Sequence, residues 1–144
     1  MRPLYYAKYL MNITIIGTGY VGLVSGACFA DIGNNVLCID KNEQKIKDLK
    51  KVEMPFYEPE LKDKVRRNSD EGRLRFSANL DEGLAHGEVA FACVDTPMSA
   101  NGEADLTNYN AMLENIGLFF AEHPKHKTIL VNKSTVPVGT AEYA

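Results

Sequence analysis

Short runs of apolar, mostly β-branched residues alternate along the chain with longer segments whose apolar residues recur at helical spacing. The short runs predict five strands, at residues 13–16, 36–39, 74–76, 89–94 and 128–131, of which the first two are expected to be buried. The segments between them predict helices, at residues 21–32, about 43–50, around 61–65, 79–85 and from 105 to about 120. Strands that alternate with helices favour a doubly wound α/β fold with a mostly parallel sheet and right-handed crossovers.

Two of these helices carry further signals. The segment 21–32 is apolar on nearly every side, which is typical of a helix buried all round, and Gly33 can supply the left-handed residue that ends it. Asp105 can cap the start of the last helix. Apolar residues at helical spacing on that helix predict a stripe that belongs to the core: Tyr109, Leu113, Ile116 and Phe120.

Polar residues cluster where the predicted strands end, at residues 17–19, 40, 95–96 and 134–135. Ligands of open parallel sheets bind outside the carboxyl ends of the strands. We therefore expect these four segments to face a single crevice. The expected strand order is 3-2-1-4-5, which leaves the fifth strand at an edge of the sheet.

The segment Gly17-Thr18-Gly19-Tyr20-Val21-Gly22 has the spacing G-x-G-x-x-G and joins the first predicted strand to the first predicted helix. In a Rossmann-type fold Gly17 permits the tight turn, Gly19 lets a diphosphate approach the backbone, and Gly22 lets helix and strand pack closely. The free N–H groups and the positive end of the helix dipole then face the phosphates. All six residues are therefore candidates for cofactor binding. The alternative is a glycine-rich turn without a ligand.

Asp40 lies 18 residues after Gly22, at the end of the second predicted strand. Its carboxylate can accept hydrogen bonds from both hydroxyls of an adenosine ribose and would repel a 2′-phosphate, which favours NAD over NADP. Lys41 could partly offset that repulsion. Lys45, one helical turn further on, can reach the same ribose. The alternatives are a turn aspartate and a surface lysine.

Two polar loops complete the candidate site. Thr96 and Pro97 follow the fourth strand, beside the glycine loop, where a hydroxyl can touch a cofactor phosphate or ribose. Ser134 and Thr135 follow the fifth strand, where the nicotinamide should lie, and their hydroxyls can position a water or a substrate oxygen. For each residue taken singly, a structural role is the alternative.

Composition narrows the range of partners. With 16 Lys and Arg against 19 Asp and Glu, and a net charge of −3, the chain has no basic excess to neutralise phosphates, so we expect no nucleic-acid partner. The absence of a run of about 18 apolar residues, and of an apolar leader, predicts a cytoplasmic protein with no membrane partner.

The cysteines and histidines suggest no further chemistry. Cys28, Cys38 and Cys93 lie in apolar runs without C-x-x-C spacing, so we expect reduced, buried thiols. The pair His123 and His126 has no cysteine or carboxylate at ligand spacing, so we expect no metal.

Two longer motifs, NITIIGTGYVGLV at residues 12–24 and KSTVPVGT at residues 133–140, stand near the two ends of the chain. Five shorter segments lie between them, at residues 26–30, 57–59 (Tyr-Glu-Pro), 72–76, 96–97 and 104–106. In this order the seven segments resemble the UDP-glucose/GDP-mannose dehydrogenase family of nucleotide-sugar dehydrogenases.

This resemblance implies an NAD-dependent oxidoreductase that oxidises the C6 alcohol of a UDP-sugar, UDP-glucose in the simplest case, to the carboxylate of UDP-glucuronate in two hydride transfers. In that family a cysteine from the later part of the chain carries the intermediate, assisted by a lysine, an asparagine and an aspartate. None of those motifs occurs in this chain, and no role as nucleophile is assigned to its cysteines.

The resemblance also assigns roles to individual residues on the cofactor side. Gly17 to Gly22 match the pyrophosphate loop, and Asp40 and Lys45 match the ribose contacts. The remaining matches are a cofactor-lining loop at Val94, Thr96 and Pro97, and a threonine that helps hold the catalytic water or substrate oxygen at Thr135.

Two residues depart from the family pattern. Asp95 stands where a small or neutral residue is expected and puts a negative charge near the cofactor loop. Glu60 replaces a glycine expected after Glu58-Pro59, so the turn at that point can differ.

The expected organisation is an N-terminal extension, residues 1–10, followed by an NAD-binding Rossmann domain, residues 11–144. This domain would be truncated after the fifth strand and would lack the UDP-sugar domains of a complete enzyme. We expect the chain to bind NAD without turnover and to self-associate through the fifth strand as a homo-oligomer. Two alternatives stay open: a non-catalytic NAD-sensing module, which does not need the segment 134–139, and a dehydrogenase of another nucleotide sugar.

Overall fold

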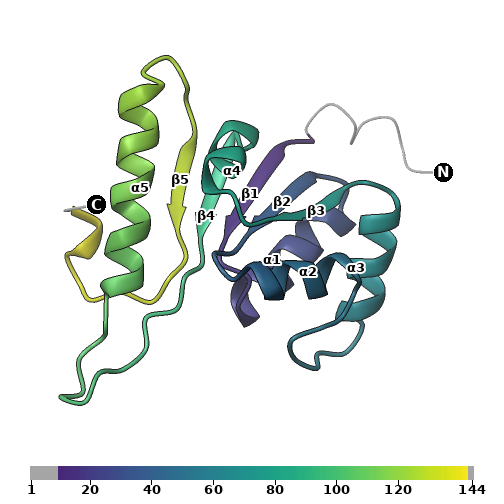
Figure 1. Ribbon diagram of the computed structural model, residues 1–144, viewed down its shortest axis with the longest axis horizontal. Helices are drawn as coiled ribbons and strands as arrows, with labels where there is room; N and C mark the ends of the chain where they lie inside the picture. Colours follow the sequence, from purple (N-terminus) through teal and green to yellow (C-terminus); the bar gives the residue numbers. More distant parts are fainter. Residues whose placement is uncertain (1–9, 143–144) are drawn as a thin grey trace.

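The computed structural model describes residues 10–142, so most of the expected N-terminal extension lies outside the described residues. At its centre is a five-stranded parallel sheet in the order β3-β2-β1-β4-β5, as the sequence predicts (Figure 1). The strands are β1 (Asn12–Ile16), β2 (Asn35–Ile39), β3 (Leu74–Ser77), β4 (Val89–Ala92) and β5 (Ile129–Asn132).

Helices cover both faces of the sheet, and each connects two strands that run in the same direction. One layer contains α1 (Tyr20–Asp31) and α3 (Leu61–Asp70), with α2 (Glu43–Lys50) beside β3. The other layer contains α4 (Leu80–His86) and α5 (Thr107–Glu122) (Figure 1). The fold is therefore the expected Rossmann-type arrangement.

The alternation of side chains along β1 supplies both cores. Ile13 and Ile15 pack with Leu23 of α1 in the first core, whereas Ile16 packs with Leu84 of α4 in the second. Each of these five residues is at most 5% exposed. Burial on both faces explains why isoleucines lie on both sides of the strand, and the one buried polar side chain, Thr14, has a hydrogen-bond partner in the Gly83 carbonyl.

The register brings the carboxyl ends of the strands level with one another. Ile16 pairs with Ile39 of β2 on one side and with Ala92 of β4 on the other. Ile39 pairs with Ser77 of β3, and Ala92 pairs with Asn132 of β5. The residues that follow these five positions therefore meet along one edge of the sheet.

Two expectations for α1 need correction. The helix is buried on one face only, through Gly22, Leu23, Gly26, Ala27 and Ala30, and is not buried all round. Its outer face has no covering element among residues 10–142, so the thiol-bearing Cys28 is exposed, whereas the other two cysteines are buried as expected. Small residues and Leu23 thus mark the packed face of this helix, and Val24 and Phe29 pack against the same core while only half-buried. The expected end of the helix is confirmed, since Gly33 has a φ of +114°.

The core stripe of α5 is also shifted from its expected position. Tyr109 and Ile116 are buried as predicted, but Leu113 and Phe120 are only partly buried. Met112 and Phe119, one residue earlier in each case, take the buried positions. The Asp105 carboxylate accepts a hydrogen bond from the Thr107 N–H (2.9 Å), so it satisfies a free donor at the start of the helix.

Strand boundaries differ from the prediction by one or two residues. β4 ends at Ala92 rather than at residue 94, and β5 runs one residue later than expected. β5 is an edge strand, and its Ile129 side chain is 66% exposed. No helix within residues 10–142 is both long and apolar enough to cross a membrane.

The contact between α4 and the sheet gives a test of the packing. At Gly83 an added Cβ would lie 2.6 Å from Ile39 Cγ1 and 3.1 Å from Thr14 Cγ2, while the Gly83 carbonyl accepts a hydrogen bond from Thr14 Oγ1. Gly83→Ala should therefore lower the free energy of unfolding, measured by urea denaturation, by about 1–3 kcal/mol.

Gly117→Ala is the matched control. This glycine lies inside α5 with no heavy atom within 4 Å of the added Cβ. Alanine should raise the free energy of unfolding there by about 0.5–1 kcal/mol, because it has the higher helix propensity. Equal shifts in the two variants would contradict the described packing of α4.

Candidate functional site

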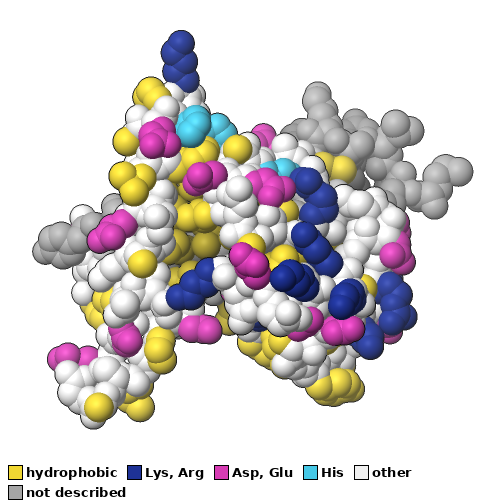
Figure 2. Space-filling model, in the orientation of Figure 1, with side chains coloured by type: hydrophobic (Ala, Val, Ile, Leu, Met, Phe, Trp, Pro, Cys, Tyr) yellow, Lys and Arg dark blue, Asp and Glu magenta, His cyan; other side chains and the backbone are white. Residues whose placement is uncertain are grey.

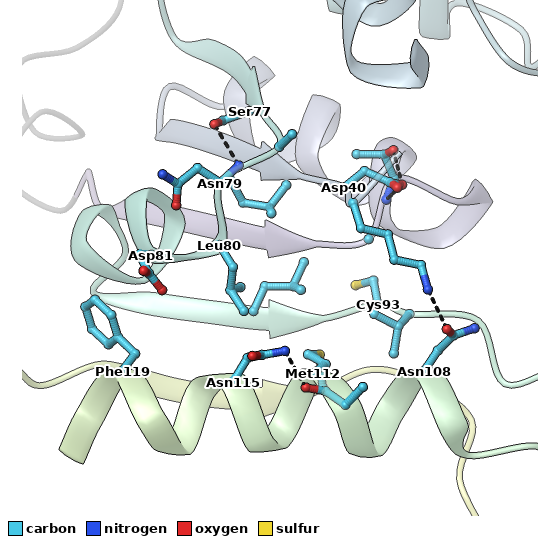
Figure 3. Close-up of a pocket in the computed structure, with 18 of the residues that line it drawn as sticks. Asp40, Ser77, Asn79, Leu80, Asp81, Cys93, Asn108, Met112, Asn115 and Phe119 are labelled. Atoms are coloured by element: carbon cyan, nitrogen blue, oxygen red, sulfur yellow. Dashed lines mark hydrogen bonds between the residues drawn. The ribbon is translucent and has the colours of Figure 1, made fainter. Parts of the chain in front are cut away.

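A cleft of about 980 Å³ opens at the edge where the strand ends meet. Its walls come from the segments that follow β1, β2 and β4, from the start of α4 and from one face of α5 (Figure 3). Hydrophobic side chains are visible in the hollow between α5 and the rest of the molecule (Figure 2). The cleft brings together five of the residues predicted for the site: Gly17, Thr18, Gly19, Asp40 and Val94.

The glycine loop is packed so tightly that two of its positions exclude any side chain. Gly17 has a φ of +103°, and an added Cβ would lie 2.4 Å from the carbonyl oxygen of Cys93. An added Cβ at Gly22 would lie 1.9 Å from the carbonyl oxygen of Gly17. The start of α1 therefore sits directly against the ends of β1 and β4, as the glycine spacing predicts.

The first turn of α1 has the features of an anion site. Its N-cap residue, Gly19, offers no side chain to the free N–H groups, and none of the first-turn residues is acidic. The first N–H groups of a helix lack partners inside the helix, and the dipole places partial positive charge there. Gly19 and Gly17 line the cleft, so this end of the helix is open to a bound phosphate.

Asp40 is held at the end of β2 by neighbours on three sides. One carboxylate oxygen accepts hydrogen bonds from the Thr18 N–H (3.0 Å), the Thr18 hydroxyl (2.6 Å) and Lys45 Nζ (3.1 Å). The other oxygen accepts one from the Asn42 N–H (3.0 Å). Burial acts to raise the pKa of the carboxyl, but the hydrogen bonds from Thr18, Asn42 and Lys45 outweigh it and hold the pKa below its ordinary value. Asp40 is therefore an ionised acceptor that faces the cleft.

Lys45 lies where the sequence predicts, one turn into α2, and its contact with the cleft is through Asp40. Its ammonium group offsets part of the charge of the carboxylate. Lys41 lines the cleft as well, and its Nζ donates to Asn108 Oδ1 of α5 at 2.6 Å. Among the described residues Lys45 is thus the lysine that pairs with Asp40.

The α4 and α5 walls of the cleft were not predicted from the sequence. On α5 the lining residues recur every three or four positions on one side of the helix, and on α4 they belong to its first turn and to the segment before it. They are Ser77, Ala78, Asn79, Leu80, Asp81, Asn108, Ala111, Met112, Asn115, Leu118, Phe119 and Glu122. The signal that could have identified the α5 wall is the polar and small side of the helix beside its core stripe, at Asn108, Ala111 and Asn115.

The loops after β4 and β5 are joined to each other. The Thr96 hydroxyl donates to the Thr135 carbonyl oxygen (2.6 Å), and the Ser134 hydroxyl donates to the Val94 carbonyl oxygen (2.9 Å). These three hydroxyl-bearing residues and Pro97 lie outside the cleft lining, at its β4–β5 end. The Ser134 and Thr96 hydroxyls are therefore engaged with the backbone, and the Thr135 side chain is the exposed hydroxyl that this junction presents.

The remaining residues of the glycine motif lie on the outer side of α1. The Tyr20 ring packs against Phe56 in a tilted arrangement, with 5.1 Å between ring centroids. Its hydroxyl donates to the Glu58 carboxylate, which raises the pKa of Tyr20. Val21 is 47% exposed. Glu60, where a glycine is expected, has a φ of +64°, so a side chain occupies a left-handed position that favours glycine.

The cysteine beside the cleft is not activated as a nucleophile. Burial raises the pKa of the Cys93 thiol to about 11, with Lys133 acting in the opposite direction, so the thiol is protonated at neutral pH. Within residues 10–142 no group of three or more His, Cys, Asp and Glu side chains could hold a metal ion. The described residues fit a dinucleotide in three respects: a backbone anion site, an ionised ribose acceptor beside it, and a slot along α5 lined by both polar and apolar side chains.

Comparison with known proteins agrees with this geometry. A family model described as the NAD binding domain of the UDP-glucose/GDP-mannose dehydrogenase family matches residues 11–144. The UDP-glucose 6-dehydrogenase of Pseudomonas aeruginosa is 47% identical over 132 residues, which cover 92% of this chain and 28% of that protein. The UDP-glucose 6-dehydrogenase TuaD of Bacillus subtilis is 47% identical over 133 residues, with the same two shares.

Two solved structures are similar in three dimensions. A UDP-glucose dehydrogenase from the archaeon Pyrobaculum islandicum superposes with a TM-score of 0.83 at 32% identity, and a GDP-mannose dehydrogenase from Pseudomonas aeruginosa with a TM-score of 0.87 at 32% identity. Each match covers 92% of this chain and 30% of the other. The chain thus spans less than a third of the length of these relatives.

Proposed function

Because the chain belongs to the UDP-glucose/GDP-mannose dehydrogenase family, as its NAD-binding domain, we propose that it serves an enzyme that oxidises UDP-glucose to UDP-glucuronate with two NAD. The choice of UDP-glucose is supported by relatives of that name at 38–47% identity. The observation that carries the proposal is the open first turn of α1 beside an ionised Asp40 in one cleft.

The residues of the chain bind the cofactor in two places. The N–H groups of the glycine loop and of the first turn of α1 hold the diphosphate. Asp40 accepts hydrogen bonds from the adenosine ribose hydroxyls, with Thr18 and Lys45 fixing its carboxylate. A 2′-phosphate would meet the same carboxylate, so NAD is preferred over NADP. Val94 and the α5 wall enclose the adenine end.

The proposed reaction balances over two steps. The first takes a hydride from C6 and a proton from the C6 hydroxyl, which gives the aldehyde. The second adds the oxygen of a water and takes a second hydride, which gives the carboxylate. In sum, one alcohol, two NAD⁺ and one water yield one carboxylate, two NADH and three protons. Bound NAD supplies the hydride acceptor.

The loops after β4 and β5 have a positioning role in this proposal. The hydroxyls of Thr96 and Ser134 donate hydrogen bonds to backbone carbonyls and so fix the loop that carries Thr135. Thr135 then holds the substrate oxygen or the water with its side chain, and Pro97 limits the freedom of the neighbouring loop. Residues 11–144 act as the cofactor-binding domain, and the chain alone binds NAD without turnover.

We propose in addition that the chain self-associates. The unpaired side of β5 exposes backbone N–H and C=O groups together with Ile129 and Leu130, which are 66% and 37% exposed. An exposed apolar edge strand is a template for pairing with another strand.

Asp40→Asn tests the cofactor proposal. The variant keeps the shape of the side chain but removes its charge, so the Kd for NAD, measured by calorimetric titration, should rise about tenfold, in line with roughly 1.4 kcal/mol for one charge-assisted hydrogen bond. The preference for NAD over NADP should narrow. Glu53→Gln, at an exposed carboxylate outside the cleft, should leave both constants unchanged. An Asp40→Asn variant that binds NAD with wild-type affinity would contradict the assignment of Asp40 to the ribose site.

Thr135→Ala, placed in a complete enzyme that carries this domain, separates a dehydrogenase from an NAD sensor. A dehydrogenase should lose at least about 100-fold in kcat, as is typical for a positioned acid–base or oxyanion contact, with the Kd for NAD retained. An unchanged kcat would favour the non-catalytic module, which has no use for this hydroxyl. Assays of the complete enzyme with a panel of nucleotide sugars, GDP-mannose among them, would identify the sugar that it oxidises.

Ile129→Lys tests the edge strand. Analytical ultracentrifugation of the wild-type chain should show oligomers that grow with concentration, and the charged variant should sediment as a monomer. Ile32→Lys, at an equally exposed apolar position directly after α1, is the control and should leave the wild-type distribution of oligomers unchanged. A wild-type chain that is monomeric across the whole concentration range contradicts the proposal.

A further inference from the structure

Asp95 places a carboxylate against the glycine loop, in the part of the cleft where the proposed diphosphate lies. It follows β4 by three residues and lines the cleft together with Gly19. An added Cβ at Gly19 would lie 3.2 Å from Asp95 Oδ1 and 3.7 Å from Asp95 Oδ2. The carboxylate therefore stands at the very face of Gly19 that must stay bare for a phosphate to approach.

The surroundings of Asp95 leave its charge largely uncompensated by side chains. The residue is exposed, and within residues 10–142 its carboxylate has no hydrogen bond or ion pair with another side chain. Among the lysines at this end of the molecule, Lys45 pairs with Asp40 and Lys41 donates to Asn108. Lys133 acts on the neighbouring Cys93 but forms no ion pair with Asp95 within residues 10–142. What faces Asp95 is the positive end of the α1 dipole.

A carboxylate in that position competes with a diphosphate for the positive electrostatic potential at the start of α1. Both groups are anions, and both are attracted to the free N–H groups of the first turn of α1. When a diphosphate with two negative charges binds, Asp95 is left within a few ångströms of it, and the repulsion at this distance in a partly exposed cleft is of the order of 1 kcal/mol.

We propose that Asp95 weakens the binding of the cofactor by opposing its diphosphate across the glycine loop, and so speeds the release of NADH. The inference rests on the proposed function, in which two molecules of NAD serve one substrate. The diphosphate is common to NAD and NADH, so one carboxylate acts on both.

The test compares the Kd of NAD for the wild-type chain, Asp95→Asn and Asp95→Ala by calorimetric titration at about 20 mM and about 500 mM salt. At low salt both variants should bind NAD about three- to tenfold more tightly than the wild type. At high salt the gain should shrink to less than about twofold, because the Debye length falls from about 20 Å to about 4 Å, which is comparable with the distance between the charges. The alanine variant shows that the gain does not come from a new hydrogen-bond donor.

Glu103→Gln is the matched control. It removes the same charge from the same loop but outside the cleft, and the Glu103 side chain contacts Asn101 instead. Its Kd should equal that of the wild type. Any of three results would overturn the inference. The control could gain affinity as well, the gain of the Asp95 variants could be the same at both salt concentrations, or the Asp95 variants could bind NAD no more tightly than the wild type. If no protein in the series binds NAD, the proposed function fails instead, and the two failures are thereby distinguished.

Discussion

The close approach of α1 to the strand ends is the constraint on which the rest of the structure depends. Gly17 and Gly22 must lack side chains, because their Cβ positions are taken by backbone oxygens of the chain itself. This approach turns the unpaired N–H groups of α1 toward the cleft. It also brings Thr18 to Asp40, where two hydrogen bonds from one residue fix the carboxylate. The anion site and the ribose acceptor are thus two consequences of one packing contact.

The parallel register extends this contact into a site. Because Ile16, Ile39 and Ala92 end level with one another, the loops that follow them are neighbours although they are up to 76 residues apart in sequence. The two helical layers then enclose the cleft, with α4 and α5 on the side away from α1 (Figure 1). Substitutions in the second core can therefore alter the cleft without touching the glycine loop.

The sequence predicted those features that depend on short-range signals. Strand order, the glycine loop and the location of Asp40 follow from apolar runs and from residues at strand ends, and the structure agrees with each of them. The exposure of Cys28 did not follow, because a helix rich in small apolar residues can bury one face as well as all faces. The α5 wall did not follow either, because which side of a helix faces a cleft depends on tertiary packing. The shift of its core stripe from Leu113 to Met112 has the same cause.

The central claim is that the start of α1 binds a diphosphate next to Asp40. Backbone amide NMR tests this claim residue by residue. On titration of the ¹⁵N-labelled chain with NAD, the largest shifts are predicted at the amides of Gly17 to Gly22 and of Asp40, with smaller ones at Val94. Shifts that are confined to other elements, such as β3 or the outer face of α3, with the glycine loop unchanged, would contradict the account.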